Sequence, residues 1–237
     1  MIIAHGHAVA CRTVGASVDV VLVHGIGVSG RYFTRLAREL SRSVGVLVLD
    51  LPGFGGSPRP AAPLSIAEHG RVVADVIART AADRPVLVGH SMGAQVVAEV
   101  ALARPEAVAG VVLVGPVVDP KARSGLRQAA RLIRDVPHET PAATVMQVRE
   151  WLRCGPRWYA ATLPEMLDYP MASRAGDLRV PVVLARGEHD PVTPARFLGM
   201  LADRIPNVRT LEVPGAGHVA MFRRPEYVAT AVLELRR

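Results

Sequence analysis

A serine, an aspartate and a histidine each follow a segment expected to form a strand, inside a short motif that contains glycine. Residues 89–93 (GHSMG) come after the apolar run ending at Val88, residues 187–190 (GEHD) after 182–184, and residues 215–218 (GAGH) after 208–213. A serine hydroxyl becomes a nucleophile when an imidazole takes its proton, and a carboxylate can orient that imidazole. We therefore predict acyl chemistry with Ser91 as nucleophile, His218 as general base and then acid, and Asp190 as the group that orients His218.

The spacing Gly-x-Ser-x-Gly around Ser91 indicates a tight turn between a strand and a helix. Small flanking residues relieve crowding in such a turn. The helix expected over 94–103 begins directly behind Ser91, so it directs free backbone N–H groups and its positive dipole end at the reaction centre. An ordinary imidazole, with a pKa near ~6.5, predicts a rate that rises through about pH 6–7.

The elements that must position these residues alternate along the chain. We expect strands over 18–23, 44–49, 86–88, 111–114, 180–184 and 208–213, and helices over 34–40, 65–80, 94–103, 195–202 and 225–235. This alternation predicts an α/β fold, with a mostly parallel sheet of about eight strands and helices on both faces. Residues 1–17 should add one or two antiparallel strands at an edge. Ser91, Asp190 and His218 then converge, because the carboxyl ends of parallel strands share one edge.

One stretch, residues 119–177, interrupts the alternation. It has no convincing strand and reads as several short helices separated by prolines, so we predict a helical cap or lid at 119–177 inserted into a core domain of residues 1–118 and 178–237. The side chains that we expect at the substrate are apolar or aromatic, either in this insertion or beside the motifs: Phe54, Trp151, Trp158, Tyr159 and Met221. Packing alone explains the same residue types equally well.

A second glycine motif points to different chemistry. Residues 25–30 (GIGVSG) follow a buried strand and precede a helix, and Asp50 ends the next strand. This order is that of a dinucleotide-binding turn followed by its ribose-binding acid. A bound nicotinamide or flavin would be visible in an absorbance scan.

Five motifs in order give the chain a resemblance to the α/β-hydrolase family along nearly its whole length: residues 24–25 (HG), 50–57 (DLPGFGGS), 89–93, 187–190 and 217–218. The resemblance implies that the backbone N–H groups of Ile26 and Met92 form the oxyanion hole and that Asp50 shapes its loop. It also implies no cofactor and no metal. Some relatives of this fold carry their acid after an earlier strand, which makes Asp119 the alternative to Asp190.

The identity of the expected nucleophile narrows the range of reactions. Family members that act as epoxide hydrolases or haloalkane dehalogenases use an aspartate where this chain has Ser91. We therefore expect hydrolysis of a carboxylic ester with a moderately hydrophobic acyl group through an acyl-enzyme. Carbon–carbon bond hydrolysis, lactone opening and thioester cleavage use the same residues and stay open. A non-hydrolytic relative that binds a ligand or serves biosynthesis is a further alternative.

Composition limits the partners. The net charge of +7 comes from 28 Lys and Arg against 21 Asp and Glu, but the basic residues are scattered and aromatic residues are only 4%, so we expect a small-molecule substrate and no nucleic acid. Two cysteines, Cys11 and Cys154, are too few for a disulfide framework. Apolar runs are far shorter than the ~20 residues that span a bilayer, and no signal peptide is apparent, so we expect a cytoplasmic protein. The sequence does not indicate an oligomeric state.

Overall fold

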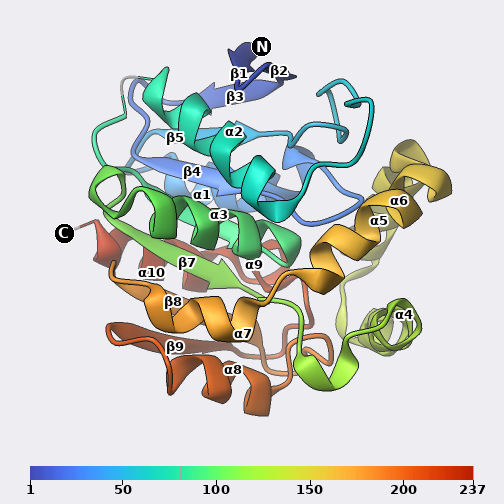
Figure 1. The fold of residues 1–237 in the computed structure, drawn as a ribbon. Helices are drawn as coiled ribbons and strands as arrows, with labels where there is room; N and C mark the ends of the chain where they lie inside the picture. Colours follow the sequence, from blue (N-terminus) through green and yellow to red (C-terminus); the bar gives the residue numbers. More distant parts are fainter. Residues whose placement is uncertain (81, 237) are drawn as a thin grey trace.

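A seven-stranded sheet forms the centre of the molecule in the computed structural model, which describes residues 1–80 and 82–236 (Figure 1). In spatial order the strands are β3 (Cys11–Val14), β5 (Val46–Leu49), β4 (Val20–Val23), β6 (Val86–His90), β7 (Gly110–Val114), β8 (Val182–Gly187) and β9 (Val208–Val213). All neighbouring pairs are parallel except β3 with β5. The predicted parallel α/β sheet is confirmed.

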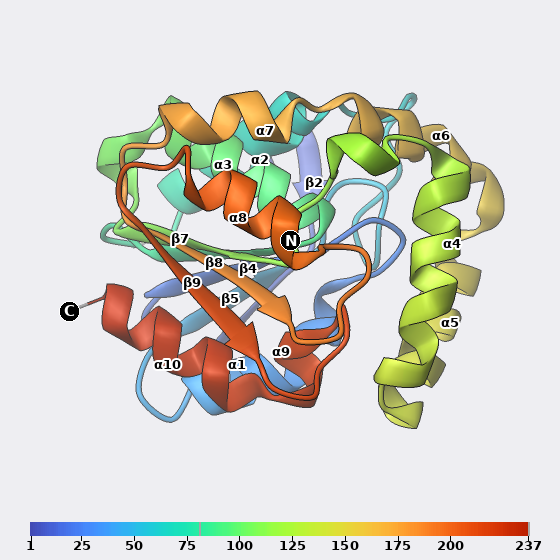
Figure 2. The same cartoon turned by 90° about the horizontal axis from the view of Figure 1, so that it is seen from below.

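Helices cover both faces of the sheet, as Figure 2 shows. One face carries α2 (Ile66–Ala78), α3 (Met92–Ala103), α7 (Met171–Arg174) and α8 (Ala195–Ala202); the other carries α1 (Thr34–Leu40), α9 (Ala220–Arg223) and α10 (Pro225–Leu235). Each face has its own apolar core. Every residue of β4, β5, β6, β7 and β8 is buried, which explains why these strands read as nearly unbroken apolar runs.

The start of α2 shows how local sequence sets an element boundary. The Ser65 hydroxyl accepts the Glu68 N–H at 3.2 Å, and the Glu68 carboxylate accepts the Ser65 N–H at 2.8 Å. This reciprocal capping box satisfies two N–H groups that the first helical turn leaves without partners. Two further expected helices, 34–40 and 195–202, have the bounds of α1 and α8.

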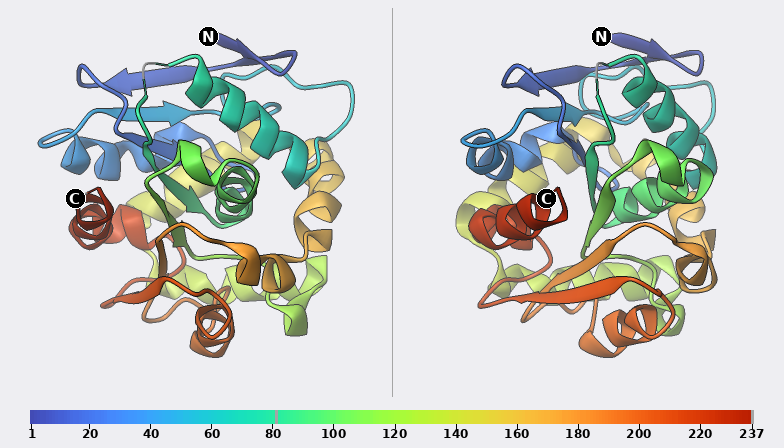
Figure 3. Two further views of the ribbon diagram at one scale, coloured as in Figure 1. Left: turned by 60° about the vertical axis from the view of Figure 1, so that its left-hand side comes forward. Right: turned by 90° about the vertical axis from the view of Figure 1, so that its left-hand side faces the viewer.

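The N-terminal segment forms more than an edge strand. β3 pairs antiparallel with β5, as expected, while β1 (Ile2–Ala4) and β2 (His7–Val9) pair with each other in a separate two-stranded ribbon. Figure 3 shows the ribbon beside β3 at the outer edge of the sheet. The main sheet thus has seven strands where about eight were expected.

The chain between β7 and β8 leaves the sheet as helices beyond the carboxyl ends of the strands (Figure 1). Its longer helices are α4 (Gly125–Asp135), α5 (Pro141–Cys154) and α6 (Pro156–Asp168), and we call residues 125–168 the cap. Pro141 and Pro156 stand at the first helical positions, where the missing N–H is not needed. The following α7 packs with the core, because Met171 is buried among core residues.

No helix in the described part of the chain combines the length and the apolar character required to cross a membrane.

Candidate active site

Ser91 occupies a strained turn between β6 and α3. Its backbone has φ 55° and ψ −119°, and its N–H donates to the Val114 oxygen at 2.9 Å. The turn brings backbone segments so close that a Cβ atom on Gly93 would lie 2.2 Å from the Val23 oxygen. Only glycine fits there, which is the physical reason for the second glycine of the motif. Strain of this kind is concentrated at functional sites.

His218 and Asp190 are joined by a buried hydrogen bond. His218 Nδ1 lies 2.9 Å from Asp190 Oδ2, and both side chains are almost fully buried. Asp190 Oδ1 accepts the N–H groups of Val192 at 2.8 Å and Thr193 at 3.0 Å. The carboxylate is therefore fixed by its own loop and can fix the imidazole in turn.

Asp190 and His218 each stabilise the ionised form of the other. Burial alone would lower the pKa of His218, but the negative charge and hydrogen bond of Asp190, together with the charges of two further buried acids, outweigh it and raise the pKa to about 8. Burial alone would likewise raise the pKa of Asp190, yet the charge of His218 and the N–H donors of Thr193 and Val192 hold it below its usual range. Asp190 is therefore ionised at neutral pH, as an orienting acid must be.

Ser91 and His218 line the same small cavity, of about 40 Å³. Within the described residues, the hydrogen bonds of His218 run to Asp190, Asp135 and His90, and none reaches Ser91 Oγ. Catalytic contacts of this type are often long in a protein without substrate and tighten when substrate binds. On a scale where one water needs ~10–15 Å³, the cavity has space for a few waters or a small chemical group.

His90 links the serine turn to the histidine loop. Because a carbonyl oxygen can only accept, His90 Nε2 donates to the His218 oxygen at 3.0 Å, which leaves Nδ1 to accept from the Tyr32 hydroxyl at 2.6 Å. Burial, followed by repulsion from His218, holds the pKa of His90 well below its usual range, so it stays neutral. His90 is thus a structural neighbour of Ser91.

The two expected oxyanion donors are the first residue of α3 and a residue that lines this cavity. Met92 begins α3, so its N–H belongs to the group that has no partner within the helix. Ile26, on the loop after β4, lines the cavity together with Ser91. The role of these two N–H groups as oxyanion donors is a proposal.

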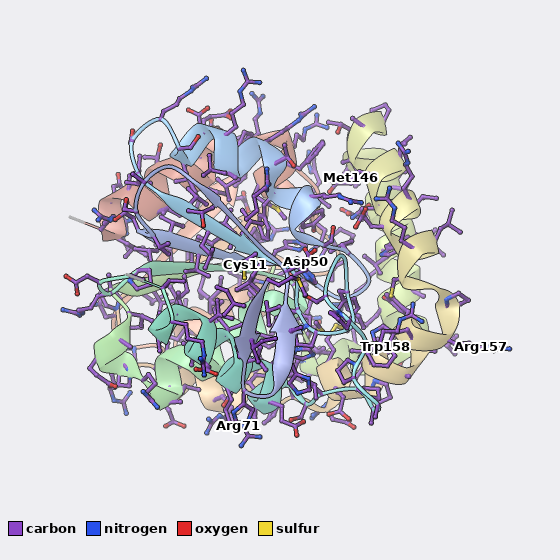
Figure 4. All side chains as sticks on the ribbon, turned by 90° about the horizontal axis from the view of Figure 1, so that it is seen from above. Cys11, Asp50, Arg71, Met146, Arg157 and Trp158 are labelled. Carbon is purple, nitrogen blue, oxygen red and sulfur yellow. The ribbon has the colours of Figure 1, made fainter. Side chains whose placement is uncertain are left out.

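The expected substrate residues separate into two groups. Trp151 and Tyr159 line the cavity that holds Ser91, whereas Phe54, Trp158 and Met221 do not. Phe54 and Met221 are buried in the two apolar cores, and Phe54 packs edge-on against His24 at 5.6 Å between ring centroids. Trp158 lies over the loop at Gly53, where a Cβ atom would come 2.4 Å from its ring. Figure 4 shows Trp158 on the inner side of the cap, with Arg157 pointing outward.

A larger apolar groove lies beside the cavity, between the cap helices. It has a volume of about 580 Å³ and shares Gln128, Leu132, Trp151 and Tyr159 with the lining of the small cavity. Its other walls are mainly aliphatic side chains of α4, α5 and α6, such as Ile133, Val148 and Leu152. The sequence indicated none of the α4 residues, although Gln128 and Leu132 have the spacing of one helix face.

Asp119, the alternative acid, is engaged elsewhere. Its carboxylate pairs with Arg131 at 2.6 Å and with Arg196, and it also accepts the Lys121 N–H at 3.0 Å. These contacts join α4 to α8, while the imidazole of His218 meets Asp190 instead. The geometry therefore supports Asp190.

The loop that resembles a dinucleotide-binding turn is occupied by protein groups. A Cβ atom on Gly27 would lie 2.7 Å from Tyr159 and 2.9 Å from Trp151, so cap side chains cover the turn. Asp50 accepts the N–H groups of Gly30 at 2.6 Å and Gly56 at 2.7 Å. Both oxygens of the acid hold loops together, which is the loop-shaping role that the resemblance implied.

Two acidic residues that the sequence analysis did not single out also hold the histidine loop. Asp135 accepts the His218 N–H at 2.9 Å, and Glu139 accepts the Val219 N–H at 2.7 Å. They come from the end of α4 and the segment after it, and no motif marks them. Their contact with His218 arises only when the cap folds over the core.

The class of protein follows from the position of these groups: a strained serine turn and a carboxylate-bound histidine at the carboxyl edge of a doubly covered parallel sheet are typical of serine hydrolases of the α/β type. A sequence profile described as the Alpha/beta hydrolase family matches residues 20–231. The chain belongs to the α/β-hydrolase family.

Two relatives that match at least 90% of this chain are named as hydrolases. The pimeloyl-[acyl-carrier protein] methyl ester esterase of Aeromonas salmonicida (strain A449) is 25% identical over 246 residues, covering 92% of this chain and 95% of that protein. The putative carbamate hydrolase RutD of Azorhizobium caulinodans is 25% identical over 236 residues, covering 90% and 88%. The structure of a thermophilic esterase from Thermogutta terrifontis matches with a TM-score of 0.84 at 23% identity, covering 96% of this chain and 92% of that one.

Proposed function

We propose that this protein hydrolyses carboxylic esters through a triad of Ser91, His218 and Asp190. The observation that carries the proposal is the buried 2.9 Å contact between His218 and Asp190 beside a cavity that Ser91 also lines. The relatives named as an ester hydrolase and a putative carbamate hydrolase support a carbonyl substrate. No step requires a cofactor.

The reaction proceeds in two halves. Ser91 Oγ attacks the carbonyl carbon while His218 Nε2 takes the serine proton, and the N–H groups of Met92 and Ile26 stabilise the negative charge on the carbonyl oxygen. The intermediate collapses, the bond to the alcohol breaks, and His218 gives its proton to the departing oxygen. Water then attacks the acyl-enzyme with His218 again as base, releasing the acid and restoring Ser91.

The groove suggests the kind of ester. The cavity at Ser91 has a volume of about 40 Å³, whereas the adjoining groove of about 580 Å³ is walled by apolar side chains. An ester with a small reacting end and an extended apolar chain fits this shape, with Trp151 and Tyr159 at the junction. We place the apolar chain of the ester between α4 and α5, where its burial supplies binding free energy of about 0.8 kcal/mol per CH₂.

Steady-state kinetics with p-nitrophenyl esters test the proposal. We expect measurable turnover by the native protein and loss of nearly all of it in Ser91→Ala. Asp190→Asn should reduce kcat by about 10⁴-fold, since a triad without its acid holds the wrong imidazole tautomer. A panel of lactones, thioesters and diketones compared at equal concentration identifies the preferred bond. Full activity in folded Ser91→Ala would refute the proposed nucleophile.

A further inference from the structure

Two buried carboxyl groups of the cap lie against the loop that carries His218. Asp135 and Glu139 are 2% and 7% exposed. They accept the N–H groups of two consecutive residues, His218 at 2.9 Å and Val219 at 2.7 Å. The cap therefore holds the backbone of the histidine loop at two adjacent points.

The preceding residue of the loop permits this approach. A Cβ atom on Gly217 would lie 2.4 Å from Asp135 Oδ1 and 2.7 Å from Glu139 Oε1. Any other residue at this position would push the loop away from the two carboxyl groups. The glycine that precedes His218 in the motif is thus explained by contact with the cap.

The two carboxyl groups also interact with each other. The position of a Cβ atom on Gly217 lies within 2.7 Å of both Asp135 Oδ1 and Glu139 Oε1, so the two carboxyl groups are close enough to repel each other strongly when both are ionised. Glu139 Oε2 is buried and has no hydrogen-bond partner among the described residues. A proton on Glu139 supplies the missing donor and removes the repulsion between two buried charges.

Charged and titratable groups surround the pair on several elements. Tyr32, His218 and Asp190 interact electrostatically with the pair. Arg223 of α9 donates at 3.3 Å to the carbonyl oxygen of His138, a residue that lies between the two acids in the sequence. Burial, followed by the charge of Asp135, raises the pKa of Glu139 to about 8. Burial and Asp190 also raise the pKa of Asp135, while His218 opposes the rise.

We propose that Asp135 and Glu139 are positioning residues for His218, forming a carboxyl pair that shares one proton and fixes the histidine loop to the cap. This inference rests on the proposed role of His218 as base. While the pair holds its proton, it carries one negative charge, which acts with that of Asp190 to favour the imidazolium. When the proton is lost in alkaline solution, two charges face each other and the hold on the loop weakens.

Substitutions at Glu139 test whether this residue positions His218 or only fills space. In Glu139→Gln the amide oxygen still accepts from Val219 and the NH₂ group still donates to Asp135, so we expect kcat near pH 7 to stay within about twofold of the native value. Glu139→Ala leaves the Val219 N–H buried without a partner, and we expect kcat to fall by about tenfold or more with little change in KM.

The exposed Glu188 provides a matched control, because it accepts the N–H of Gly215 on the same loop at 2.8 Å. We expect Glu188→Ala to leave kcat unchanged. Equal kcat values for Glu139→Ala, Glu139→Gln and the native protein would overturn the positioning role.

The pH dependence of kcat/KM tests the shared proton, because a residue that only fills space would not change it. The ratio of native to Glu139→Gln kcat/KM should fall as the pH rises through about 8, because only the native pair loses a proton there. Each single neutral variant, Asp135→Asn or Glu139→Gln, keeps one charge in the pair, whereas the double variant has none. Only the double variant should therefore shift the acid limb of kcat/KM to lower pH. A flat ratio together with an unshifted double variant contradicts the proposal.

Melting temperatures test the shared proton without any activity. In the unfolded chain Glu139 ionises near its ordinary pKa of ~4.3, but in the folded protein it keeps the proton to about pH 8. Native stability relative to Glu139→Gln should therefore fall as the pH rises from about 5 to 8 and then level off. A constant difference would show that the pair holds no shared proton, even if the proposed ester chemistry fails.

Discussion

His90 Nε2 donates a hydrogen bond to the backbone oxygen of His218 at 3.0 Å, so the residue before Ser91 holds the loop of the proposed base. The other ring nitrogen accepts from Tyr32, which makes the imidazole a rigid link between the strand β6 and the loop after β9. Together with the bonds from His218 and Val219 to the cap, this contact fixes the histidine backbone from two sides.

Replacing His90 should therefore impair the rate more than binding. In His90→Phe the His218 carbonyl loses its buried donor, and we expect kcat to fall about tenfold through misplacement of the imidazole, with KM nearly unchanged. Steady-state kinetics measure both constants. His189→Ala serves as control, because His189 flanks Asp190 but is half-exposed. Equal losses in the two variants would argue against a specific link through His90.

The pH dependence of the native protein should reflect the elevated pKa of His218. Below about pH 8 the imidazole is largely protonated and cannot take the serine proton, so kcat/KM should rise through about pH 8. This differs from the rise through about pH 6–7 expected for an ordinary imidazole, because Asp190 stabilises the charged form. A pH–rate profile with a short ester measures the limb, and a midpoint near 6 would show that the buried acids around His218 do not stabilise its charged form in solution.

Substitution of Asp119 should lower the stability of the protein, whereas substitution of Asp190 should lower kcat. Asp119→Asn leaves Arg131 and Arg196 without their buried partner, so we expect a loss of about 1–3 kcal/mol in the free energy of unfolding and a change in kcat of less than about twofold. Asp190→Asn should instead lower kcat severely. Urea titrations and kinetics on the two variants decide the matter, and a severe kcat defect in Asp119→Asn would reopen the choice of acid.

The positions of Ser91, Asp190 and His218 at strand ends could be predicted from the sequence, and the side chains that packing contributes could not. Each of the three follows a strand of one parallel sheet, so order along the chain implies convergence in space. Phe54 and Met221 are also close to motifs in sequence, yet their side chains enter the apolar cores, because distance along a loop does not determine which way a side chain points.

The cap contains residues whose contacts could not be predicted from the sequence. Its helical character follows from proline positions and the lack of strand patterns, but the contact of Asp135 and Glu139 with the histidine loop depends on how the cap folds over the sheet. No local pattern distinguishes these two acids from solvent-exposed ones on the same helices. Gly217 is the only sequence signal, and its meaning becomes clear when the carboxyl oxygens opposite it are seen.

Chain-length preference should depend on the groove. Leu152 lines it and is 76% exposed, so Leu152→Glu introduces a charge without disturbing the core. We expect kcat/KM for an octanoyl ester to fall about tenfold, while that for an acetyl ester stays unchanged, because only the longer chain reaches the groove. Kinetics with an ester series measure this difference.

The matched control is Leu126→Glu, since Leu126 is 86% exposed on α4 and does not line the groove. It should leave both esters unaffected. Parallel losses for short and long esters in Leu152→Glu would place the chain elsewhere.

Labelling by a fluorophosphonate probe examines the activated serine itself, since the reagent modifies a hydroxyl only when a base has made it nucleophilic. Intact-protein and peptide mass spectrometry should show a single adduct on Ser91, no adduct in Ser91→Ala, and labelling slowed by about 10³-fold or more in His218→Ala. Folded native protein that stays unlabelled, or that reacts equally fast without His218, would contradict the triad.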